Sequence, residues 1–323
     1  MKKLLKRLIS FILSIILLLV VIVFVIPYIE SVNKQNVEGS SDWMASLSDS
    51  LSLSQINIPG SHDSSTQYVN LPFFMRCQSF NYTNQLEKGV RYLDLRISSS
   101  QDTLILVHDF AHCTVNVLPF SQTLTVESIL SDIYAFLKDH PTETILLNIK
   151  TESNDTNSHL ISLLRELINK DSDYWYLGTY IPSLGDTRGK VIYGHRYEDS
   201  DGLNLNFSDQ GGYSDTSLNI SKTEYSDYNV YVQDRYNYNA TEKWTAFTEG
   251  LKASSERVNP STSLCINFLS THGHSALGHP YYYAYKLNKQ LLEYDIDTIG
   301  NFNIIVLDFV TSDLCYKVYS TNN

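Results

Sequence analysis

Two hydrophobic periodicities alternate along most of this 323-residue chain. Short runs rich in aliphatic and β-branched residues are separated by longer segments in which apolar residues recur every three or four positions. The first pattern is typical of strands and the second of amphipathic helices. The pattern predicts strands at residues 54–60, 90–98, 102–109, 143–152, 189–197, 228–236, 263–271 and 302–310.

Between several of these strands the apolar spacing predicts helices at residues 124–140, 157–170, 241–256 and 280–294. The clearest has Val126, Ile129 and Ile133 on one face and Thr125 as a plausible N-cap. Strands that alternate with helices predict an α/β fold with a parallel sheet, either open or closed. Most strand positions are apolar, which indicates strands covered on both faces. If the sheet closes into a barrel, catalytic side chains are expected at the carboxyl ends of its strands.

The first thirty residues have a different pattern. Four basic residues, Lys2, Lys3, Lys6 and Arg7, precede an apolar run from residue 11 to 26. Counted from residue 8, this run approaches the roughly 20 residues that cross a bilayer as a helix. Basic residues on its amino side predict that the N-terminus stays in the cytoplasm and the remainder is exported. A signal peptide, with secretion after cleavage, is the alternative, but no small-residue cleavage site follows, which favours an uncleaved anchor.

This division predicts an anchor at residues 1–29, a polar tether at 30–42 and a single extracytoplasmic domain at 43–323, which is long enough for one large core. The net charge of −11 argues against a nucleic-acid partner. The 23 tyrosines suit a protein that works at the boundary between water and lipid. The four cysteines have no metal-binding spacing, and three full disulfide pairings are open to them.

Polar and ionisable residues follow seven of the predicted strands, where buried strands usually avoid them. A single polar strand end would mean little, but the recurrence predicts one polar pocket at one end of the sheet. These residues are His62, Asp63, Asp94, Arg96, His108, Asp109, Lys150, Glu152, His195, Arg196, Asp234, Arg235, Tyr236 and Asp308.

The composition of this set favours cleavage of a phosphodiester without a metal or a cofactor. Two histidines, His62 and His108, can act as general base and general acid near neutral pH. Arg96 offers a planar fork that fits phosphate oxygens. Asp63 and Asp308 are candidates for orienting a histidine. Since no serine or cysteine lies in a recognisable nucleophile context, the nucleophile is expected to come from the substrate or from water.

Structural interpretations of the same residues remain open at this stage. His62 and Asp63 can form a local hydrogen-bonded turn, His108 can be a buried core histidine, and Arg96 with Asp94 can be a simple ion pair. Lys150 and Glu152 are compatible with a solvated strand end. The remaining histidines are expected in loops or at the surface, and their spacing does not fit a zinc site. They are His112, His159, His272, His274 and His279.

Several segments of the chain, taken together, carry a family resemblance. "INIPGSHDSS", "GVRYLDLRI", "LILVHDF", "FLKDHPTETILLNIKTE", "VYVQDRY" and "IIVLDFV" resemble the bacterial phosphatidylinositol-specific phospholipases C. The resemblance runs in order from residue 43 to about residue 309. It implies a distorted TIM barrel that cleaves phosphatidylinositol, or a glycosylated form of it, to diacylglycerol and a cyclic inositol phosphate, with the inositol 2-hydroxyl as nucleophile. It also implies a membrane surface as partner, and a monomer.

The resemblance implies a role for each motif residue. His62 would be the general base with Asp308 beside it, His108 the general acid with Asp63 beside it, and Arg96 the phosphate ligand. The presence of an arginine at position 96 is similar to the metal-independent branch of the family, so no metal ligand is expected. The residues expected to bind substrate are Asp94, Lys150, Arg196, Asp234 and Tyr236.

One motif departs from the family pattern. Relatives usually carry His-Gly at the second histidine, whereas this chain has His108 followed by Asp109. Two other classes of function compete with the phospholipase. A calcium-dependent glycerophosphodiester phosphodiesterase would share the barrel but would have an acidic residue in place of Arg96. A barrel that only binds inositol lipids would be expected to have lost His62 or Arg96, and both are present.

Overall fold

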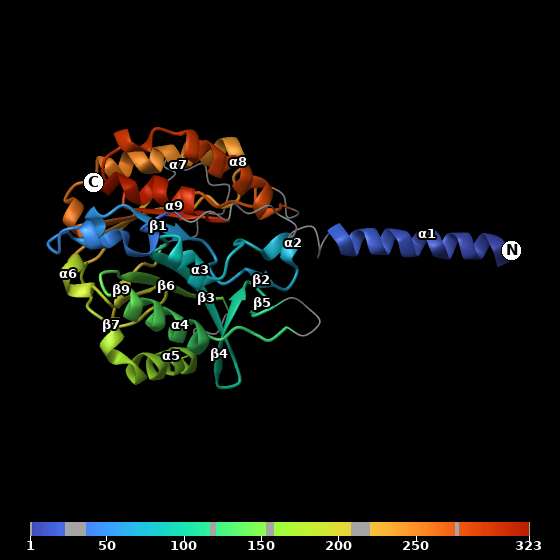
Figure 1. Ribbon diagram of the computed structural model, residues 1–323, viewed down its shortest axis with the longest axis horizontal. Helices are drawn as coiled ribbons and strands as arrows, with labels where there is room; N and C mark the ends of the chain where they lie inside the picture. Colours follow the sequence, from blue (N-terminus) through green and yellow to red (C-terminus); the bar gives the residue numbers. More distant parts are fainter. Residues whose placement is uncertain are drawn as a thin grey trace.

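The computed structural model describes residues 2–22, 37–116, 121–152, 158–207, 220–274 and 278–322. Within these ranges the chain forms a mixed α/β structure around one sheet (Figure 1). The predicted α/β class is therefore confirmed. All eight predicted strands and all four predicted helices are present, with bounds that differ by a few residues.

Eight strands run parallel to their neighbours in the order β11, β12, β13, β1, β3, β6, β8 and β9. Their bounds are β1 Ile58–Ser61, β3 Tyr92–Ser100, β6 Ile145–Thr151, β8 Val191–His195, β9 Leu203–Asn204, β11 Asn229–Gln233, β12 Ser263–Phe268 and β13 Ile304–Leu307. β1 lies at the centre of this order, with β13 on one side and β3 on the other. The first and last parts of the domain therefore pair side by side, which brings residues 62 and 308 together.

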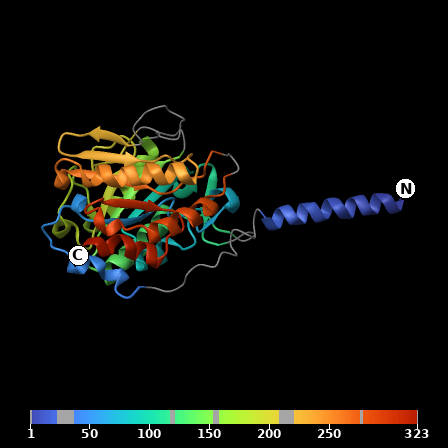
Figure 2. The same ribbon diagram turned by 90° about the horizontal axis from the view of Figure 1, so that it is seen from above.

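The helices lie outside the sheet and cover it, which is why the strands are apolar on both faces (Figures 1 and 2). α7 packs on β11 and β12, α9 packs on β1, and α8 packs on α7 and α9. Thr125 caps α4 by accepting a hydrogen bond from the backbone N–H of Ser128, as the sequence predicts. The helix bounds are α2 Pro72–Met75, α3 Tyr82–Glu87, α4 Val126–Asp139, α5 Ser158–Lys170, α6 Leu184–Thr187, α7 Ala240–Ser255, α8 Pro280–Glu293 and α9 Ser312–Tyr319.

Short antiparallel strands extend the sheet at two places. β4 (Thr103–His108) folds back on β3 as a hairpin, then pairs with β5 (Ala111–Thr114), which pairs with β2 (Tyr68–Val69). β10 (Ser221–Glu224) is antiparallel to β11, and β7 (Trp175–Tyr176) lies parallel to β8. The expectation that residues 102–109 form one more parallel strand is wrong. β3 is too long for the barrel, and its overhanging end has an antiparallel partner in β4.

The two ends of the parallel order, β9 and β11, are linked by side chains. No ladder joins them within the described ranges, but Tyr225 and Tyr228 donate hydrogen bonds from their hydroxyls to the side chain and the backbone carbonyl of Asn204. The strand order thus curls back on itself with a seam at this position. Such a curled sheet gathers the carboxyl ends of its strands around one opening.

The N-terminal residues form helix α1 (Lys2–Val20), drawn apart from the sheet in Figure 1, and none of its residues is buried. Over the described residues, no helix combines the length and the apolar character that crossing a bilayer requires. In α1 the basic residues at positions 2, 3, 6 and 7 take up the first two turns, and the apolar part that follows is shorter than about 20 residues. The structure therefore does not support the predicted span over residues 1–29, of which 23–29 lie outside the described ranges, as do tether residues 30–36.

Candidate active site

Residues from β1, β3, β4, β6, β8 and β11, or directly after them, surround a polar cavity of about 580 Å³. Seven of the predicted site residues line it, among them both histidines and Arg96; besides Tyr236 they are His62, Arg96, His108, Lys150, Arg196 and Asp234. A second cavity of about 270 Å³ adjoins it, shares His62 and His108, and has the apolar side chains of Phe74, Met75 and Pro280 in its wall. One end of the sheet therefore combines a charged pocket with a less polar one.

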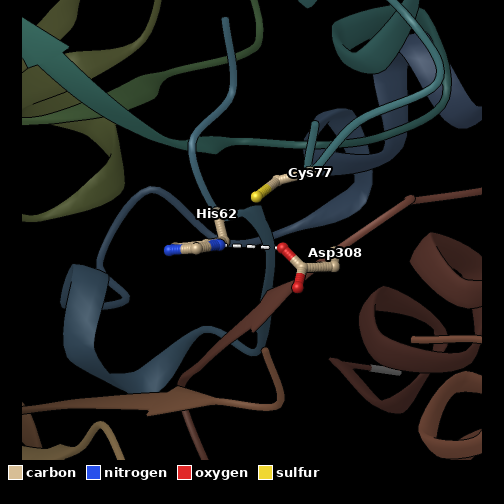
Figure 3. A group of neighbouring side chains, drawn as sticks. All are labelled: His62, Cys77 and Asp308. Atoms are coloured by element: carbon tan, nitrogen blue, oxygen red, sulfur yellow. Dashed lines mark hydrogen bonds and ion pairs between the residues drawn. The ribbon is translucent and has the colours of Figure 1, made fainter. Parts of the chain in front are cut away.

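His62 has charged partners on both ring nitrogens. Its Nδ1 lies 2.8 Å from Oδ1 of Asp308, which follows β13 (Figure 3). Its Nε2 lies 3.0 Å from Nη2 of Arg96 and 3.2 Å from Oδ2 of Asp63. The contact with Arg96 is a hydrogen bond only when Nε2 carries no proton, and the contact with Asp63 only when it does. Two competing partners thus face the nitrogen that points into the cavity.

The charge around His62 favours its protonated form. Burial by itself lowers the pKa of this imidazole, but the carboxylates of Asp63 and Asp308 outweigh burial and raise the pKa to about 9. Burial also raises the pKa of Asp308, although His62 acts in the opposite direction. The pair is thus suited to accept a proton on His62 and to hold the resulting cation.

Arg96 lies among three carboxylates. Its Nε is 2.5 Å from Asp63 and 3.8 Å from Asp94, and its Nη1 is 2.6 Å from Glu152. Burial lowers the pKa of Arg96, but these carboxylates raise it well above its usual value. In turn, burial raises the pKa of Asp63, while Arg96 and then the two histidines lower it to about 2. The guanidinium therefore remains charged while its Nη2 faces the cavity beside His62.

His108 is placed as a proton donor. Its Nδ1 lies 2.7 Å from the carbonyl oxygen of Met75, and its Nε2 lies 3.2 Å from Oδ2 of Asp63. Both partners are acceptors, so both contacts are hydrogen bonds only when the ring carries two protons. The ring centroids of His62 and His108 are 6.3 Å apart and the rings are nearly perpendicular. By contrast, His112 on β5 is exposed.

His108 reaches the cavity although β4 runs against the other strands. β3 extends beyond the barrel, and Ser100 pairs with Thr103 at the far end of the hairpin. β4 then returns toward the sheet, and His108 at its end comes level with Arg96. The longer β3 and the turn after it therefore bring His108 to the cavity, where the end of a parallel strand would also have placed it.

A residue with left-handed backbone follows each of His62, His108 and Asp308. Asp63, Asp109 and Phe309 have φ values of 41°, 54° and 50°. Aspartate adopts this region more readily than most residues because its short side chain bonds locally, and glycine adopts it without a steric cost. The departure at residue 109 thus has a physical basis, because an aspartate can replace the glycine that relatives carry at a position of positive φ.

The predicted substrate ligands divide into two groups. Lys150, Arg196, Asp234 and Tyr236 line the polar cavity. Asp94 is fully buried and does not line it, and instead its carboxylate receives hydrogen bonds from the backbone N–H of Asp63 and the side chain of Asn148. This position does not support direct contact of Asp94 with a substrate. It holds the turn that carries Asp63.

Glu152, His272 and Cys77 line the cavities, although no catalytic or substrate-binding role was predicted for any of them from the sequence. Glu152 bridges Arg96 and Lys150, and its strand end was noted in the sequence without a role. His272 lines both cavities although the sequence suggests a surface loop. Cys77 lines the smaller cavity. Cys77 lies between α2 and α3 in the chain and not at the end of a predicted strand, so the sequence pattern does not identify it as a site residue. All four cysteines are free thiols, so none of the possible disulfides is present.

Comparison with known families identifies the first half of the domain. Residues 53–197 match the family described as phosphatidylinositol-specific phospholipase C, X domain. The resemblance stated from the sequence motifs is confirmed, and the matched segment contains His62, Arg96, His108 and Lys150.

Two curated bacterial proteins match most of the chain, and both are named 1-phosphatidylinositol phosphodiesterase. One, from Listeria monocytogenes, is 24% identical over 303 residues, covering 89% of this chain and 87% of the relative. The other, from Staphylococcus aureus strain Newman, is 28% identical over 267 residues, covering 77% and 81%. These matches extend beyond residue 197 into the second half of the domain.

Solved structures show the same fold. The phosphatidylinositol-specific phospholipase C from Listeria monocytogenes aligns with a TM-score of 0.70 at 22% identity, covering 88% of this chain and 99% of that chain. A structure of the Staphylococcus aureus enzyme aligns with a TM-score of 0.73 at 23% identity, covering 88% and 98%. The curled sheet is therefore the TIM-like barrel of these phospholipases, as the resemblance implied.

Proposed function

We propose that this protein is a phosphatidylinositol-specific phospholipase C that cleaves an inositol phospholipid to diacylglycerol and inositol 1,2-cyclic phosphate. The observation that carries the proposal is that His62, Arg96 and His108 line one cavity, with Asp308 against His62 and with Asp63 in contact with both histidines and with Arg96. Base, acid and phosphate ligand are the three groups that an in-line displacement at phosphorus requires. The names of the two bacterial relatives support the same activity.

In the proposed reaction, Nε2 of His62 takes the proton of the inositol 2-hydroxyl as that oxygen bonds to phosphorus. Asp308 stabilises the imidazolium that forms, through its 2.8 Å contact with Nδ1. The bond between phosphorus and the diacylglycerol oxygen breaks, and His108 donates its Nε2 proton to the leaving oxygen. One proton is gained by His62 and one is lost by His108, so the cyclic diester and the alcohol form without water.

Arg96 supplies electrostatic stabilisation in this scheme. Charge grows on the phosphate oxygens in the transition state, and Nη2 is the guanidinium nitrogen that faces the cavity beside His62. When the phosphate takes this donor, Nε2 of His62 is released from it and is free to accept the hydroxyl proton. Substrate binding and base activation are thereby coupled through one contact.

The two cavities suit the two parts of the substrate. We assign the inositol ring to the polar cavity, where Lys150, Arg196, Asp234 and Tyr236 offer charged and hydroxyl groups. The guanidinium of Arg196 lies 3.9 Å from the centre of the Phe207 ring, which holds it in place along the wall. We assign the glycerol side to the smaller cavity with Phe74, Met75 and Pro280.

A calcium-dependent phosphodiesterase is a weaker alternative because of the charge balance around Arg96. Asp63, Asp94 and Glu152 would suit a cation, but the guanidinium already lies among them at 2.5 to 3.8 Å. A second cation there would meet its repulsion. Chelators are accordingly expected to leave the reaction rate unchanged.

We further propose that residues 43–323 form one catalytic domain, that it works as a monomer, and that residues 1–29 attach it to the outer face of a membrane. The exposed apolar residues of α1 and the basic residues before them support attachment. Fractionation of cells that express the full chain tests this point. Recovery of the uncleaved protein in the soluble fraction would reject attachment, and recovery of a shortened form in the medium would indicate cleavage and secretion.

The activity itself is tested by phosphorus NMR with mixed micelles of phosphatidylinositol and the purified protein. A signal in the cyclic diester range that later decays to a monoester is the expected result. Appearance of the monoester from the start would point to water as the nucleophile, and an unchanged lipid signal would reject the activity. Parallel incubations with phosphatidylcholine control for headgroup selectivity.

A further inference from the structure

Cys77 is a buried thiol that the proposed proton transfers do not use. Its Sγ lies 4.0 Å from Oδ2 of Asp63 and 4.0 Å from Nδ1 of His108. Figure 3 shows this sulfur turned toward the contact between His62 and Asp308. A ring nitrogen of His62, the sulfur of Cys77 and a carboxylate oxygen of Asp308 all lie within 4.8 Å of one another.

These three donors form a set that zinc and related cations bind. Zinc takes thiolate, imidazole and carboxylate ligands at about 2.0 to 2.3 Å in a tetrahedral arrangement, often with three protein ligands and one open position. Calcium and magnesium prefer oxygen ligands alone. The three residues also line the same cavity of about 270 Å³, so a cation and a fourth ligand have access to them.

Two other groups of donors near the same place are less suitable. Asp63, Cys77 and His108 also lie close together, but there a cation would compete with Arg96 for Asp63 and with the Met75 carbonyl for His108. His62, Asp63 and Asp94 contain no thiol, and Arg96 lies against both carboxylates. In the set with Asp308 the cation replaces one hydrogen bond, between His62 and Asp308.

We propose that His62, Cys77 and Asp308 form an inhibitory site for zinc and other thiophilic divalent cations. This inference rests on the proposed function, because inhibition is defined against the phospholipase reaction. Binding releases the thiol proton of Cys77 and the Nδ1 proton of His62, and no oxidation or reduction takes place. The cation separates His62 from Asp308 and adds positive charge beside the ring, so Nε2 no longer accepts a proton.

The inhibition test compares the unmodified protein with Cys77→Ser and Cys265→Ser. Cys265 is a matched control because it is also a buried free cysteine but lies on β12, outside these donor groups. Each protein is titrated with zinc in a buffer without chelating components, and each rate is compared with the same variant's metal-free rate. Cys77→Ser is expected to need at least about tenfold more zinc for half-inhibition, while Cys265→Ser matches the unmodified protein.

A second measurement does not depend on activity. X-ray absorption of the unmodified protein with one equivalent of zinc is expected to show one sulfur at about 2.3 Å and lighter ligands at about 2.0 to 2.2 Å. A coordination shell without sulfur overturns the proposal, even if Cys77→Ser does not fold. Equal zinc sensitivity of Cys77→Ser and the unmodified protein also overturns it. If no lipid cleavage is found at all, a zinc–sulfur shell that is lost in Cys77→Ser still supports the site, so the two proposals fail separately.

Discussion

Two arginines, one at the start and one in the middle of β3, have very different surroundings, and the first is fully buried whereas the second is partly exposed. Arg91, just before the strand, donates hydrogen bonds to Glu143 and to the carbonyl oxygens of Leu86, Val90 and Ser41. Its guanidinium also lies over the ring of Phe136. One carboxylate balances the charge, and backbone carbonyls take most of the remaining N–H groups.

Arg96, five residues later, has side chains as its partners, namely three carboxylates and a histidine: Asp63, Asp94, Glu152 and His62. The negative charge around it exceeds its own charge. His62 and Asp63 also compete for the same contacts. Such an arrangement changes partners easily when a phosphate arrives.

The comparison separates a structural arginine from one that is available for chemistry, although both are ion-paired. At Arg91 the partners are rigid backbone groups, so any change costs stability. At Arg96 the partners are titratable side chains, and one of them, His62, is the base of the proposed reaction. The presence of a salt bridge therefore does not distinguish the two roles. They differ in the kind of partner, which is mainly backbone carbonyls for Arg91 and side chains for Arg96.

The largest loss of activity is expected from replacing His62, which contacts Arg96. His62→Ala should lower kcat by about 10³- to 10⁴-fold with phosphatidylinositol, because a general base typically contributes on that order. His108→Ala should show a similar loss with the lipid but a much smaller one with a p-nitrophenyl inositol phosphate, whose leaving group needs no proton. His112→Ala is the matched control, and a loss in that variant with full activity in His108→Ala would exchange the two assignments.

The second prediction tests the two arginines directly. Arg96→Lys keeps the charge but loses the planar fork, and kcat/KM should fall by about 10²- to 10³-fold with little change in melting temperature. Arg91→Lys should instead lower the free energy of unfolding by about 2 to 4 kcal/mol and leave kcat per folded molecule unchanged. Thermal melts and active-site titration measure both. If both variants mainly lose stability, the distinction between a structural Arg91 and a catalytic Arg96 is wrong.

Asp308→Asn should reduce kcat by about 10²-fold or more and shift the pH profile. Burial lowers the pKa of His62, but Asp63 and Asp308 raise it to about 9, and the base must be unprotonated to act. The rate therefore rises with pH through the acidic limb of the profile. Loss of the Asp308 charge lowers the pKa of His62, so this limb should move to lower pH in a plot of kcat/KM. A limb that moves to higher pH would contradict the pairing.

A smaller effect is expected at Asp109, whose φ is 54°. Asp109→Gly should leave activity within about threefold and stability unchanged or slightly increased, because glycine adopts this conformation without strain. Asp109→Val should be less stable by about 1 to 3 kcal/mol, since a β-branched residue is disfavoured there. Urea denaturation of both variants measures the difference. Equal stability of the two would argue against the left-handed backbone at this position.

The smallest effect is expected from chelation. Incubation with excess EDTA should not lower the rate of the metal-free protein, because Arg96 provides the positive charge next to Asp63 and Glu152. Addition of calcium after EDTA serves as the control. A strong loss that calcium restores would favour the calcium-dependent alternative, and it would also place a cation where the guanidinium lies.

The sequence pattern predicted much of this arrangement for a simple physical reason. Parallel strands that are covered by helices end at one edge, so the polar residues after them must meet. This argument placed His62, Arg96, Lys150 and Asp308 in one group before any coordinates were considered. It failed for Asp94, which shares a strand face with Arg96 but lies two residues further from the strand end, where it is fully buried and Asn148 donates a hydrogen bond to its carboxylate.

The sequence by itself determined the α/β class, the strand ends and the resemblance to the phosphatidylinositol-specific phospholipases C, since periodicity and local motifs depend on residues near one another in the chain. Only the tertiary structure showed that β4 runs antiparallel, that His108 and not His112 faces Asp63, and that Cys77 lies against His62 and Asp308. These are contacts between residues far apart in the chain. They depend on how far β3 extends beyond the barrel and on how the segment between α2 and α3 packs. The hydrophobic periodicity of the sequence does not predict either feature.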